Sequence, residues 1–410
     1  MRVLAYTSPA RGHLFPLVAI AQELRRRGHD VAVRTLAAEV DRLRALGFAA
    51  APIAPAIEAL EHDDHAARSP IGGLRRSLAT FARRAPHEVD DLRGAIAQQR
   101  PDVVLVDCAA WGASAAAEAW GGPWAQWFPY PLPLSAPDVP PFGPGFAPAA
   151  GPLGRLRDRV VGPPLLRVLE RASLPRFNPV RVAAGAPPFR RADDMWTAAP
   201  LLLHLSAEPF EHPRAHWPPN VRLVGPCAWD PPGEDPPWLA ALGDRPLVLV
   251  TTSSEFQDDG RLVRTALDAL AEEDVDVVAT LPSAQLDGPI PPNARVERFV
   301  PHGPLLGRAA CAVTHGGAGA TQKALAAGVP VCVVPFGRDQ LEVASRVEGC
   351  QAGVRLPRRR LGAARLRAAV HEAIARRDGA ARVARAFADA GGPPAAADHL
   401  EALAARHDAL

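Results

Sequence analysis

The sequence has very little lysine, almost no net charge and no long hydrophobic run, and each absence excludes a class of protein. Lys323 is the only lysine, and the 46 basic residues nearly balance 44 acidic ones, which leaves a formal net charge of +2. A nucleic-acid binder needs a basic surface to neutralise phosphates, so we expect no nucleic-acid partner. No apolar run reaches the roughly 18 residues of a membrane-spanning helix, so we expect no membrane span.

Cysteine is also scarce, and its spacing indicates no covalent framework. The five cysteines include no Cys-x-x-Cys pair, and three of them lie in or beside apolar, strand-like runs. Buried free thiols are typical of a reducing compartment. The first residues, MRVLAYTSPARGH, lack the apolar core that a signal peptide needs. We therefore expect a cytoplasmic protein.

What the sequence does contain is an alternation of strand-like and helix-like segments. A length of 410 residues, with 48% hydrophobic and 22% charged residues, predicts an ordinary globular protein of about two domains. Expected strands lie at 3–7, 31–34, 103–106, 247–250, 275–281 and 331–334, and expected helices at 14–24 and 262–270. The alternation predicts doubly wound α/β domains.

Two proline-rich segments interrupt this alternation. The first, at about 128–148, is also rich in aromatic residues, and prolines resist regular structure. A long loop inside a compact domain is more often functional than not. We interpret it as a substrate-covering loop, with a disordered surface excursion as the alternative. The second segment, 229–238, is interpreted as an interdomain linker.

The most informative segment runs from Arg298 to Gln340 and joins a glycine-rich turn to a polar pair. A short apolar strand, 311–314, is followed by HGGAGA at 315–320 and then by a helix. Glycine lets the backbone approach a ligand closely, and the unpaired amides at a helix start attract an anion. Downstream, Asp339-Gln340 offers groups that hydrogen-bond hydroxyls. A phosphate cradle followed by a hydroxyl-binding pair predicts a nucleotide-sugar ligand.

The order of motifs in this segment resembles a known signature. Phe299-Val300-Pro301-His302, His315-Gly316-Gly317, Gly328-Val329-Pro330, Pro335 and Asp339-Gln340 follow one another as in the donor-binding region of family 1 glycosyltransferases. The resemblance extends to the N-terminal GHLFPLVAIAQEL, so it covers both halves of the chain. It implies the α/β GT-B fold, in which two Rossmann-like domains face each other across a cleft.

The resemblance also implies an order of domains along the chain. We expect an N-terminal acceptor-binding domain at 1–205, an interdomain linker at 206–240 and a C-terminal nucleotide-sugar-binding domain at 241–385. We expect the last helix, at 386–410, to pack back on the N-terminal domain.

For the nucleotide, the resemblance implies a role for each residue that matches the family pattern. Phe299 would stack on the nucleobase, and Val300 would bond the edge of the base through its backbone. The diphosphate would accept hydrogen bonds from His315 and from the amides of Gly317, Ala318, Gly319 and Ala320.

Three further residues are implied in donor binding. Ser254, in the turn after strand 247–250, would meet the phosphates, although hydroxyl capping of the turn is the alternative. Asp339 and Gln340 would bind the hydroxyls of the transferred sugar, because an Asp accepts hydrogen bonds and a Gln both donates and accepts them. A helix-capping role is the alternative for Asp339.

Two positions depart from the family pattern. At the position of Ala320 the family commonly has Ser or Thr. Ala320 keeps the backbone contact to the diphosphate but lacks the hydroxyl, which the adjacent Thr321 could supply. Many relatives carry Glu at the position of Lys323, near the ribose, and a lysine cannot accept hydroxyl hydrogen bonds. Lys323 therefore either reaches a phosphate or points into solvent. Because a deoxyribose lacks one hydroxyl, the change favours a thymidine diphosphate sugar over a uridine diphosphate sugar.

His13 and Asp107 are the candidate catalytic residues. His13 follows the first strand at the start of the first helix, and Asp107 ends the strand at 103–106. Loops at the carboxyl ends of parallel strands line the ligand crevice in this fold class. A near-neutral imidazole suits removal of a hydroxyl proton, and a carboxylate fixes its tautomer. The resemblance agrees, and it implies direct displacement with inversion and without a covalent intermediate.

We expect no metal, and no cofactor beyond the nucleoside diphosphate sugar as co-substrate. Asp274-Val275-Asp276 matches the Asp-x-Asp pattern of metal-dependent glycosyltransferases of another fold, but it precedes a strand and lies away from the crevice, so we expect a solvated turn. The cluster at 62–65, HDDH, is expected to be a polar loop, because adjacent side chains diverge on a helix.

Three functions are compared. The preferred one is an inverting hexosyltransferase with a small, largely apolar, natural-product-like acceptor. A non-catalytic relative that binds or activates is the alternative, which the intact catalytic pair disfavours. A nicotinamide-dependent dehydrogenase would need Gly-x-Gly-x-x-Gly after the first strand, where SPARGH stands instead. Trp111, Trp127, Phe128 and Tyr130 are either acceptor walls or core. Monomer and homodimer both remain open.

Overall fold

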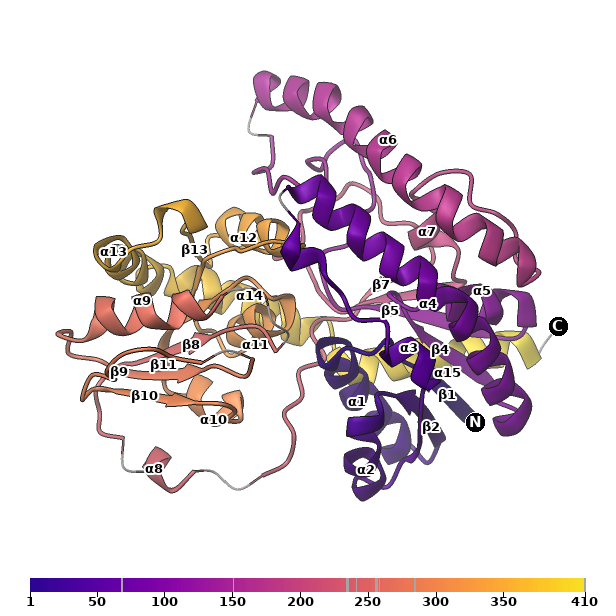
Figure 1. Cartoon of the computed structure of the whole chain (residues 1–410), viewed down its shortest axis with the longest axis horizontal. Helices are drawn as coiled ribbons and strands as arrows, with labels where there is room; N and C mark the ends of the chain where they lie inside the picture. The colour runs from indigo at the N-terminus through magenta and orange to yellow at the C-terminus, as the bar shows by residue number, and fades with distance from the viewer. Residues whose placement is uncertain are drawn as a thin grey trace.

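Two α/β domains, each built around one parallel sheet, make up the protein (Figure 1). The computed structural model describes residues 1–67, 69–149, 151–233, 236–240, 242–254, 257, 259–283 and 285–408. The α/β fold class with two Rossmann-like domains, predicted from the sequence, is confirmed.

The N-terminal domain contains a seven-stranded sheet with strand order β3-β2-β1-β4-β5-β6-β7. Its strands are β1 (Arg2–Tyr6), β2 (Asp30–Thr35), β3 (Ala49–Pro52), β4 (Val103–Asp107), β5 (Trp124–Phe128), β6 (Leu201–His204) and β7 (Val221–Leu223). Its helices are α1 (Arg11–Arg26), α2 (Ala37–Ala45), α3 (Pro55–Glu58), α4 (Pro70–Gln99), α5 (Trp111–Trp120), α6 (Pro152–Ala183) and α7 (Asp194–Thr197), with a 3-10 turn, η1, at Asp64–Ala66.

Both faces of this sheet are buried, which explains why its central strands are apolar throughout. Side chains alternate along a strand, so Val3 and Ala5 of β1 share a core with α1, whereas Leu4 and Tyr6 share a core with α4 and α5. A parallel sheet covered on both sides reads as a continuous hydrophobic run. That is the pattern of Val103–Asp107, where every residue is buried.

The C-terminal domain contains a six-stranded parallel sheet with strand order β10-β9-β8-β11-β12-β13. Its strands are β8 (Leu247–Thr251), β9 (Asp276–Thr280), β10 (Ala294–Glu297), β11 (Ala309–Thr314), β12 (Val331–Val333) and β13 (Gly353–Arg355). Its helices are α9 (Gly260–Leu270), α10 (His302–Leu306), α11 (Ala318–Ala326), α12 (Gln340–Gly349), α13 (Ala363–Ile374) and α14 (Arg377–Asp389), with a 3-10 turn, η2, at Arg358–Arg360. A short helix, α8 (Pro237–Ala240), lies between the domains in sequence.

The strand order of each sheet places a ligand crevice at its centre. The order reverses between β1 and β4 in the first sheet and between β8 and β11 in the second. At such a switch point, the loops that leave the two central strands diverge and open a crevice at their carboxyl ends. The loops after β1 and β4 are therefore expected to form one half of a site, and the loops after β8 and β11 the other half.

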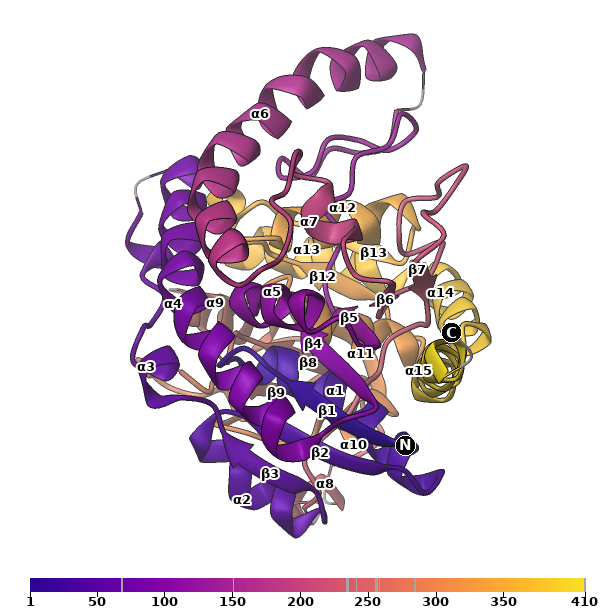
Figure 2. The same cartoon turned by 90° about the vertical axis from the view of Figure 1, so that its right-hand side faces the viewer.

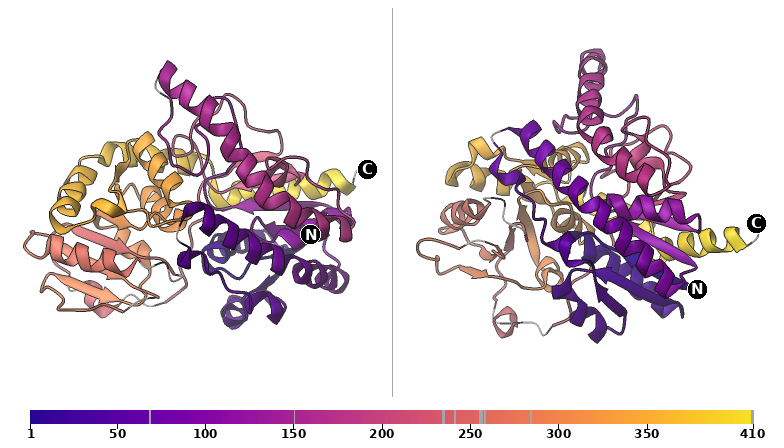
Figure 3. Two further views of the ribbon diagram at one scale, coloured as in Figure 1. Left: turned by 45° about the horizontal axis from the view of Figure 1, so that its top comes forward. Right: turned by 45° about the vertical axis from the view of Figure 1, so that its right-hand side comes forward.

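The last helix, α15 (Gly392–Asp408), returns to the first domain. Whereas α14 packs against α11 of the C-terminal domain, α15 packs against α1 and reaches β4 and β6. Figures 1 and 3 show α15 running beside the N-terminal sheet, so the C-terminus lies with the N-terminal domain. The chain therefore crosses between the domains twice.

The longest helices, α4 and α6, lie together on the outer side of the N-terminal domain. They pack against one another, and Figure 2 shows the first half of α6 standing out from the rest of the molecule. Among the residues that the structure describes, no helix combines the length and the apolar character that crossing a membrane requires.

Candidate active site in the interdomain cleft

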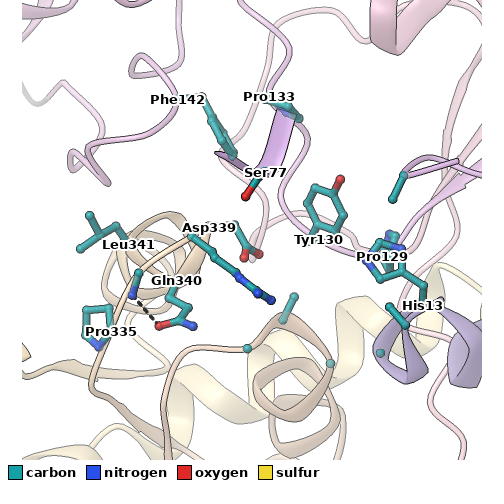
Figure 4. Close-up of a pocket in the computed structure, with 18 of the residues that line it drawn as sticks. His13, Ser77, Pro129, Tyr130, Pro133, Phe142, Pro335, Asp339, Gln340 and Leu341 are labelled. Carbon is teal, nitrogen blue, oxygen red and sulfur yellow. Dashed lines mark hydrogen bonds between the residues drawn. The ribbon is translucent and has the colours of Figure 1, made fainter. Parts of the chain in front are cut away.

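A cavity of about 2080 Å³ lies between the two domains, and loops from both sheets line it. Figure 4 shows His13, Pro129 and Tyr130 on one side and Asp339, Gln340 and Leu341 on the other. The two halves expected from the strand order thus meet in one cavity.

His13 and Asp107 are in direct contact at the N-terminal side of this cavity. His13 lies in the first turn of α1, which follows β1, and Asp107 is the last residue of the neighbouring strand β4. The Nδ1 atom of His13 lies 2.7 Å from Oδ1 of Asp107. The His13 side chain is 20% exposed while Asp107 is fully buried, so the imidazole links a buried carboxylate to the cavity.

Asp107 is held as a carboxylate by the groups around it. Its Oδ2 accepts hydrogen bonds from the amide and the hydroxyl of Ser8, at 2.8 and 2.5 Å. Its Oδ1 accepts one from the amide of Ala109 at 3.0 Å, besides that from His13. Burial alone would raise the pKa of Asp107, but the charge and hydrogen bond of His13 outweigh burial, and the pKa lies below its usual value. Both oxygens are thus hydrogen-bonded: Ser8 holds Oδ2, and Oδ1 contacts the imidazole.

A possible metal-binding group involves the same pair. Ligand atoms of His13, Asp107 and Cys108 lie within 4.8 Å of one another. Burial raises the pKa of the Cys108 thiol, and its Sγ lies 3.6 Å from the Tyr130 hydroxyl. Asp107 already accepts four hydrogen bonds, from Ser8, His13 and Ala109, so both of its oxygens are engaged. The arrangement fits a His–Asp pair better than a metal site.

The glycine-rich turn faces this pair from the C-terminal domain. Gly316 has φ of 94°, which favours glycine, and α11 begins at Ala318. The first hydrogen bond within the helix runs from the amide of Thr321 to the carbonyl of Gly317, at 3.1 Å. The amides of Ala318, Gly319 and Ala320 precede it and have no acceptor within the helix. These three residues line the cavity, as expected for an anion cradle.

His315 lies beside this turn as a neutral, buried imidazole. Burial lowers the pKa of His315 to about 4, so the ring carries no charge near neutral pH. A Cβ atom added to Gly317 would lie 2.5 Å from Nε2 of His315, so the ring is packed tightly against the turn.

The predicted nucleobase and phosphate residues also lie on the cavity. Phe299 is 57% exposed at the cavity wall, whereas Val300 beside it is buried. Ser254 lies past the carboxyl end of β8 and lines the cavity as an exposed residue. An exposed aromatic side chain at a cavity wall is available for stacking.

Asp339 and Gln340 stand at the start of α12 but differ in what their side chains do. Oε1 of Gln340 accepts hydrogen bonds from the amides of Phe336 and Gly337, at 2.6 and 2.9 Å, and Nε2 donates to Gln257 at 2.5 Å. Gln340 therefore shapes the loop before α12, and one hydrogen of Nε2 remains to donate. Burial raises the pKa of Asp339, and the charges of Arg338 and of His13 across the cleft oppose that effect.

Known proteins resemble this chain over its whole length. It is 35% identical over 390 residues to 4'-demethylrebeccamycin synthase of Lentzea aerocolonigenes, with 91% of each chain covered. The chain belongs to the family 1 glycosyltransferases of the natural-product type. Residues 264–403 of this glycosyltransferase match the family model described as Erythromycin biosynthesis protein CIII-like, C-terminal domain.

Two further proteins resemble the glycosyltransferase over nearly its whole length. TDP-daunosamine transferase DnrS of Streptomyces peucetius is 29% identical over 458 aligned positions, which cover 100% of this chain and 98% of that protein. The crystal structure of the glycotransferase of kitacinnamycin superposes with a TM-score of 0.75, at 24% identity and with 98% of each chain covered. The latter likeness shows the GT-B fold.

Lys323 of the glycosyltransferase does not point into solvent, since its side chain is paired and only 18% exposed, so that expectation was wrong. Contact with a phosphate stays a prediction. Its Nζ lies 2.6 Å from Oδ1 of Asp230 and 3.1 Å from the carbonyl of Trp229. Asp230 also accepts a hydrogen bond from the amide of Gly303 at 3.1 Å. The only lysine thus fixes the proline-rich linker against α11, and both members of the ion pair line the cavity.

Thr321 does not supply the hydroxyl that Ala320 lacks. Its side chain is fully buried, and its Oγ1 lies 3.1 Å from Oγ1 of Thr314. The residue is directed into the domain because position 321 lies on the inner face of α11. No signal in the sequence distinguishes an inner from an outer threonine at the start of a helix.

The two acidic motifs set aside as polar surface are only partly so. Asp274 is exposed, as expected for a solvated turn, but Asp276 is buried in β9 and paired with Arg245. In the segment at 62–65, Asp64 forms a two-pronged ion pair with Arg338 of the other domain, at 2.9 and 3.0 Å. That ion pair bridges the cleft beside Asp339, and no local pattern in the sequence predicts it.

The aromatic residues proposed as acceptor walls divide into two groups. Trp111 and Tyr130 line the cavity, whereas Trp127 and Phe128 are fully buried at the end of β5. Aromatic residues are favoured in buried strands, which accounts for the second group. Residues 129–149, which follow β5, contain neither helix nor strand, and many of their prolines line the cavity.

Proposed function

We propose that the protein transfers a sugar, with inversion, from a nucleoside diphosphate sugar to a hydroxyl of a small, largely apolar acceptor. The observation that carries the proposal is the His13–Asp107 pair, with its 2.7 Å contact, facing the cradle of α11 and Asp339 across one cavity. An acceptor bound beside His13 would lie between the base and the donor sugar. The apolar residues Leu74, Leu78, Leu166 and Leu169 line the same cavity beyond His13 and suit an apolar acceptor.

His13 would act as the general base. With Nδ1 donating its hydrogen to Asp107, Nε2 is the nitrogen that would take the proton of the acceptor hydroxyl. The acceptor oxygen then forms a bond to the anomeric carbon as the bond from that carbon to the diphosphate breaks. The bonding electrons leave with the diphosphate, and attack from the opposite face inverts the configuration. Asp107 stabilises the imidazolium that results.

The leaving diphosphate would be stabilised by dipoles of the C-terminal domain. The amides of Ala318, Gly319 and Ala320 point from the positive end of α11. His315 lines the cavity beside these amides, with Nε2 of its neutral ring against Gly317, where an N–H would donate to a phosphate oxygen. We propose that these groups support the leaving group, so that the reaction needs neither a metal nor a further cofactor.

For the donor we propose a thymidine diphosphate sugar, with a uridine diphosphate sugar as the alternative. A relative named TDP-daunosamine transferase is 29% identical over the whole chain. Lys323 cannot accept a hydrogen bond from a hydroxyl, which disfavours the ribose of UDP relative to the deoxyribose of TDP, because ribose has one more hydroxyl. Exchanging the ion pair, with Lys323→Glu and Asp230→Lys together, keeps the contact and places a carboxylate on α11. Turnover of UDP-glucose relative to TDP-glucose should rise, and an unchanged ratio would contradict this assignment.

Mass spectrometry of products tests the function as a whole. Purified protein is incubated with TDP- and UDP-sugars and a panel of phenolic and macrocyclic acceptors, and glycoside formation is expected for the wild type and not for His13→Ala. His371→Ala is the control, because His371 is 58% exposed on α13 and paired with Glu273. If the wild type binds a nucleotide but forms no product with any donor, a non-catalytic binding role replaces the proposal.

A further inference from the structure

The proline-rich segment after β5 is attached to the opposite domain. The amides of Gly143 and Gly145 both donate to Oε1 of Glu342 on α12, at 2.7 and 2.9 Å. The carbonyl of Phe146 accepts a hydrogen bond from Ser345 of α12 at 2.7 Å, and that of Gly145 accepts one from Arg355 at 2.9 Å. Three side chains of the C-terminal domain therefore hold the backbone of a segment that belongs to the N-terminal domain.

Glu342 is itself fixed by a buried ionic cluster that spans both domains. Its Oε2 accepts a hydrogen bond from Arg346 at 2.9 Å, and Arg346 donates another to Glu211, of the segment between β6 and β7, at 2.8 Å. The side chains of Glu342, Arg346 and Glu211 are no more than 3% exposed. Buried charges persist only when they are paired and hydrogen-bonded, so this cluster has one well-defined arrangement.

The segment also presses directly on the first turn of α12. Gly145 has φ of 63°, and a Cβ atom there would lie 2.3 Å from the carbonyl oxygen of Leu341. Any larger residue must therefore lift the segment away from α12. Glycine is required at 145 both by its backbone conformation and by this close approach.

The attached residues carry part of the cavity wall. Phe142 and Pro144 line the cavity beside Leu341, and Figure 4 shows Phe142 on the side of the cavity away from His13. Asp339 begins the same helix that holds them. This part of the cavity wall is therefore held by the helix that follows Asp339.

We propose that Glu342 is a positioning residue that completes the acceptor subsite from the donor domain. The inference rests on the proposed function, since it assigns Phe142 and its neighbours to acceptor binding. Glu342 itself does not line the cavity. It acts through the amides of Gly143 and Gly145, which place the apolar wall, so loosening this attachment should weaken acceptor binding and leave nucleotide binding intact.

The test compares Gly145→Ala with Gly151→Ala in the full chain. Gly151 lies in the same connection, has an extended backbone and has no atom within 4 Å of an added Cβ, so it controls for the substitution itself. For Gly145→Ala we expect the acceptor KM to rise about tenfold, with donor KM and the thermal shift caused by TDP within twofold of wild type. Glu342→Gln should act in the same direction, with Glu372→Gln, which is 59% exposed on α13 and paired with Arg376, as its control.

Acceptor affinity is also measured without turnover, by quenching of tryptophan fluorescence with the phenol of the panel that the wild type binds most tightly. Trp111 and Trp196 line the cavity and report on binding there. An inactive wild type would refute the proposed function and leave this comparison intact. Equal acceptor affinity in Gly145→Ala and Gly151→Ala would overturn the inference, and so would an equal loss of donor and acceptor affinity in Gly145→Ala.

Discussion

Replacing Asp107 by Asn removes the charge that holds His13 while nearly preserving shape. The carboxylate accepts four hydrogen bonds, two from Ser8 and one each from His13 and Ala109. An amide has a single oxygen, so its NH₂ group must face either the Ser8 amide or the Ala109 amide. In both orientations a buried donor loses its acceptor, which costs about 1–3 kcal/mol of folding stability.

The effect on catalysis is separate from this loss of stability and larger. As His13 takes the proton, imidazolium and carboxylate become opposite charges about 4 Å apart between charge centres, which at an effective dielectric constant of about 20 is worth about 4 kcal/mol. That stabilisation exists in the transition state and not with neutral Asn. Since about 1.4 kcal/mol corresponds to a factor of ten in rate, we expect kcat to fall by about 10³.

Initial rates of glycoside formation at saturating TDP-sugar and acceptor measure this change directly. Donor binding, followed as the thermal shift caused by TDP, should be unchanged because Asp107 lies in the other domain. Asp102→Asn is the matched control, since Asp102 precedes the same strand at its opposite end and pairs with Arg2 at the surface. A folded Asp107→Asn protein that keeps more than a tenth of the wild-type kcat would refute the role given to this pair.

Three other changes test a buried carboxyl of α4 and two parts of the donor side. Burial raises the pKa of Glu88, on α4, to about 8 in the folded protein, whereas the pKa in the unfolded chain lies near 4.5. Between these two pKa values the folded state binds more protons than the unfolded state, so the free energy of unfolding falls as pH rises. The melting temperature of Glu88→Gln relative to wild type should therefore increase from pH 5 to 8, and a constant difference would contradict the protonation assigned. Gly317→Ala pushes a Cβ against His315 and should weaken TDP binding at least tenfold. Gly362→Ala, at an extended position before α13 with open space around its Cβ, should not; equal TDP affinities would count against the cradle. Phe299→Ala removes base stacking worth about 1–3 kcal/mol, so donor KM should rise about 5- to 100-fold. The melting temperature should stay unchanged because the Phe299 side chain is exposed. An unchanged donor KM would exclude stacking.

The contact between the two proposed catalytic residues could be anticipated from local patterns. An apolar strand ending in Asp107, and His13 directly after another strand, predict neighbours if the two strands are adjacent and parallel. The strand order confirms that β1 pairs with β4. The prediction works because parallel strands all end at one edge of the sheet, which fixes position along the strand without knowledge of any side-chain contact.

Short or irregular elements were not recognisable in the same way. The expected loop at about 128–148 includes the last residue of β5, whose sequence is WAQWF, because prolines follow at 129 and 131. Strands β7 and β13 have three residues each, too few to show a period. Gln340 matched a hydroxyl-binding pattern, yet its oxygen is used by two backbone amides of its own loop. Whether a backbone amide or a ligand uses such a polar group depends on the conformation of the loop, which the sequence pattern does not specify.

The sequence by itself determined the parallel α/β architecture, the glycine-rich turn before α11 and the placement of His13 and Asp107 at strand ends, because these depend on short-range periodicity and on backbone geometry. Only the tertiary structure decided which distant polar groups meet. Lys323 pairs with Asp230 over 93 residues, Glu342 with Gly145 over 197 and Arg338 with Asp64 over 274. A charged side chain in a loop has many possible partners, and the choice among them is made when the two domains dock and bring particular groups within hydrogen-bonding distance.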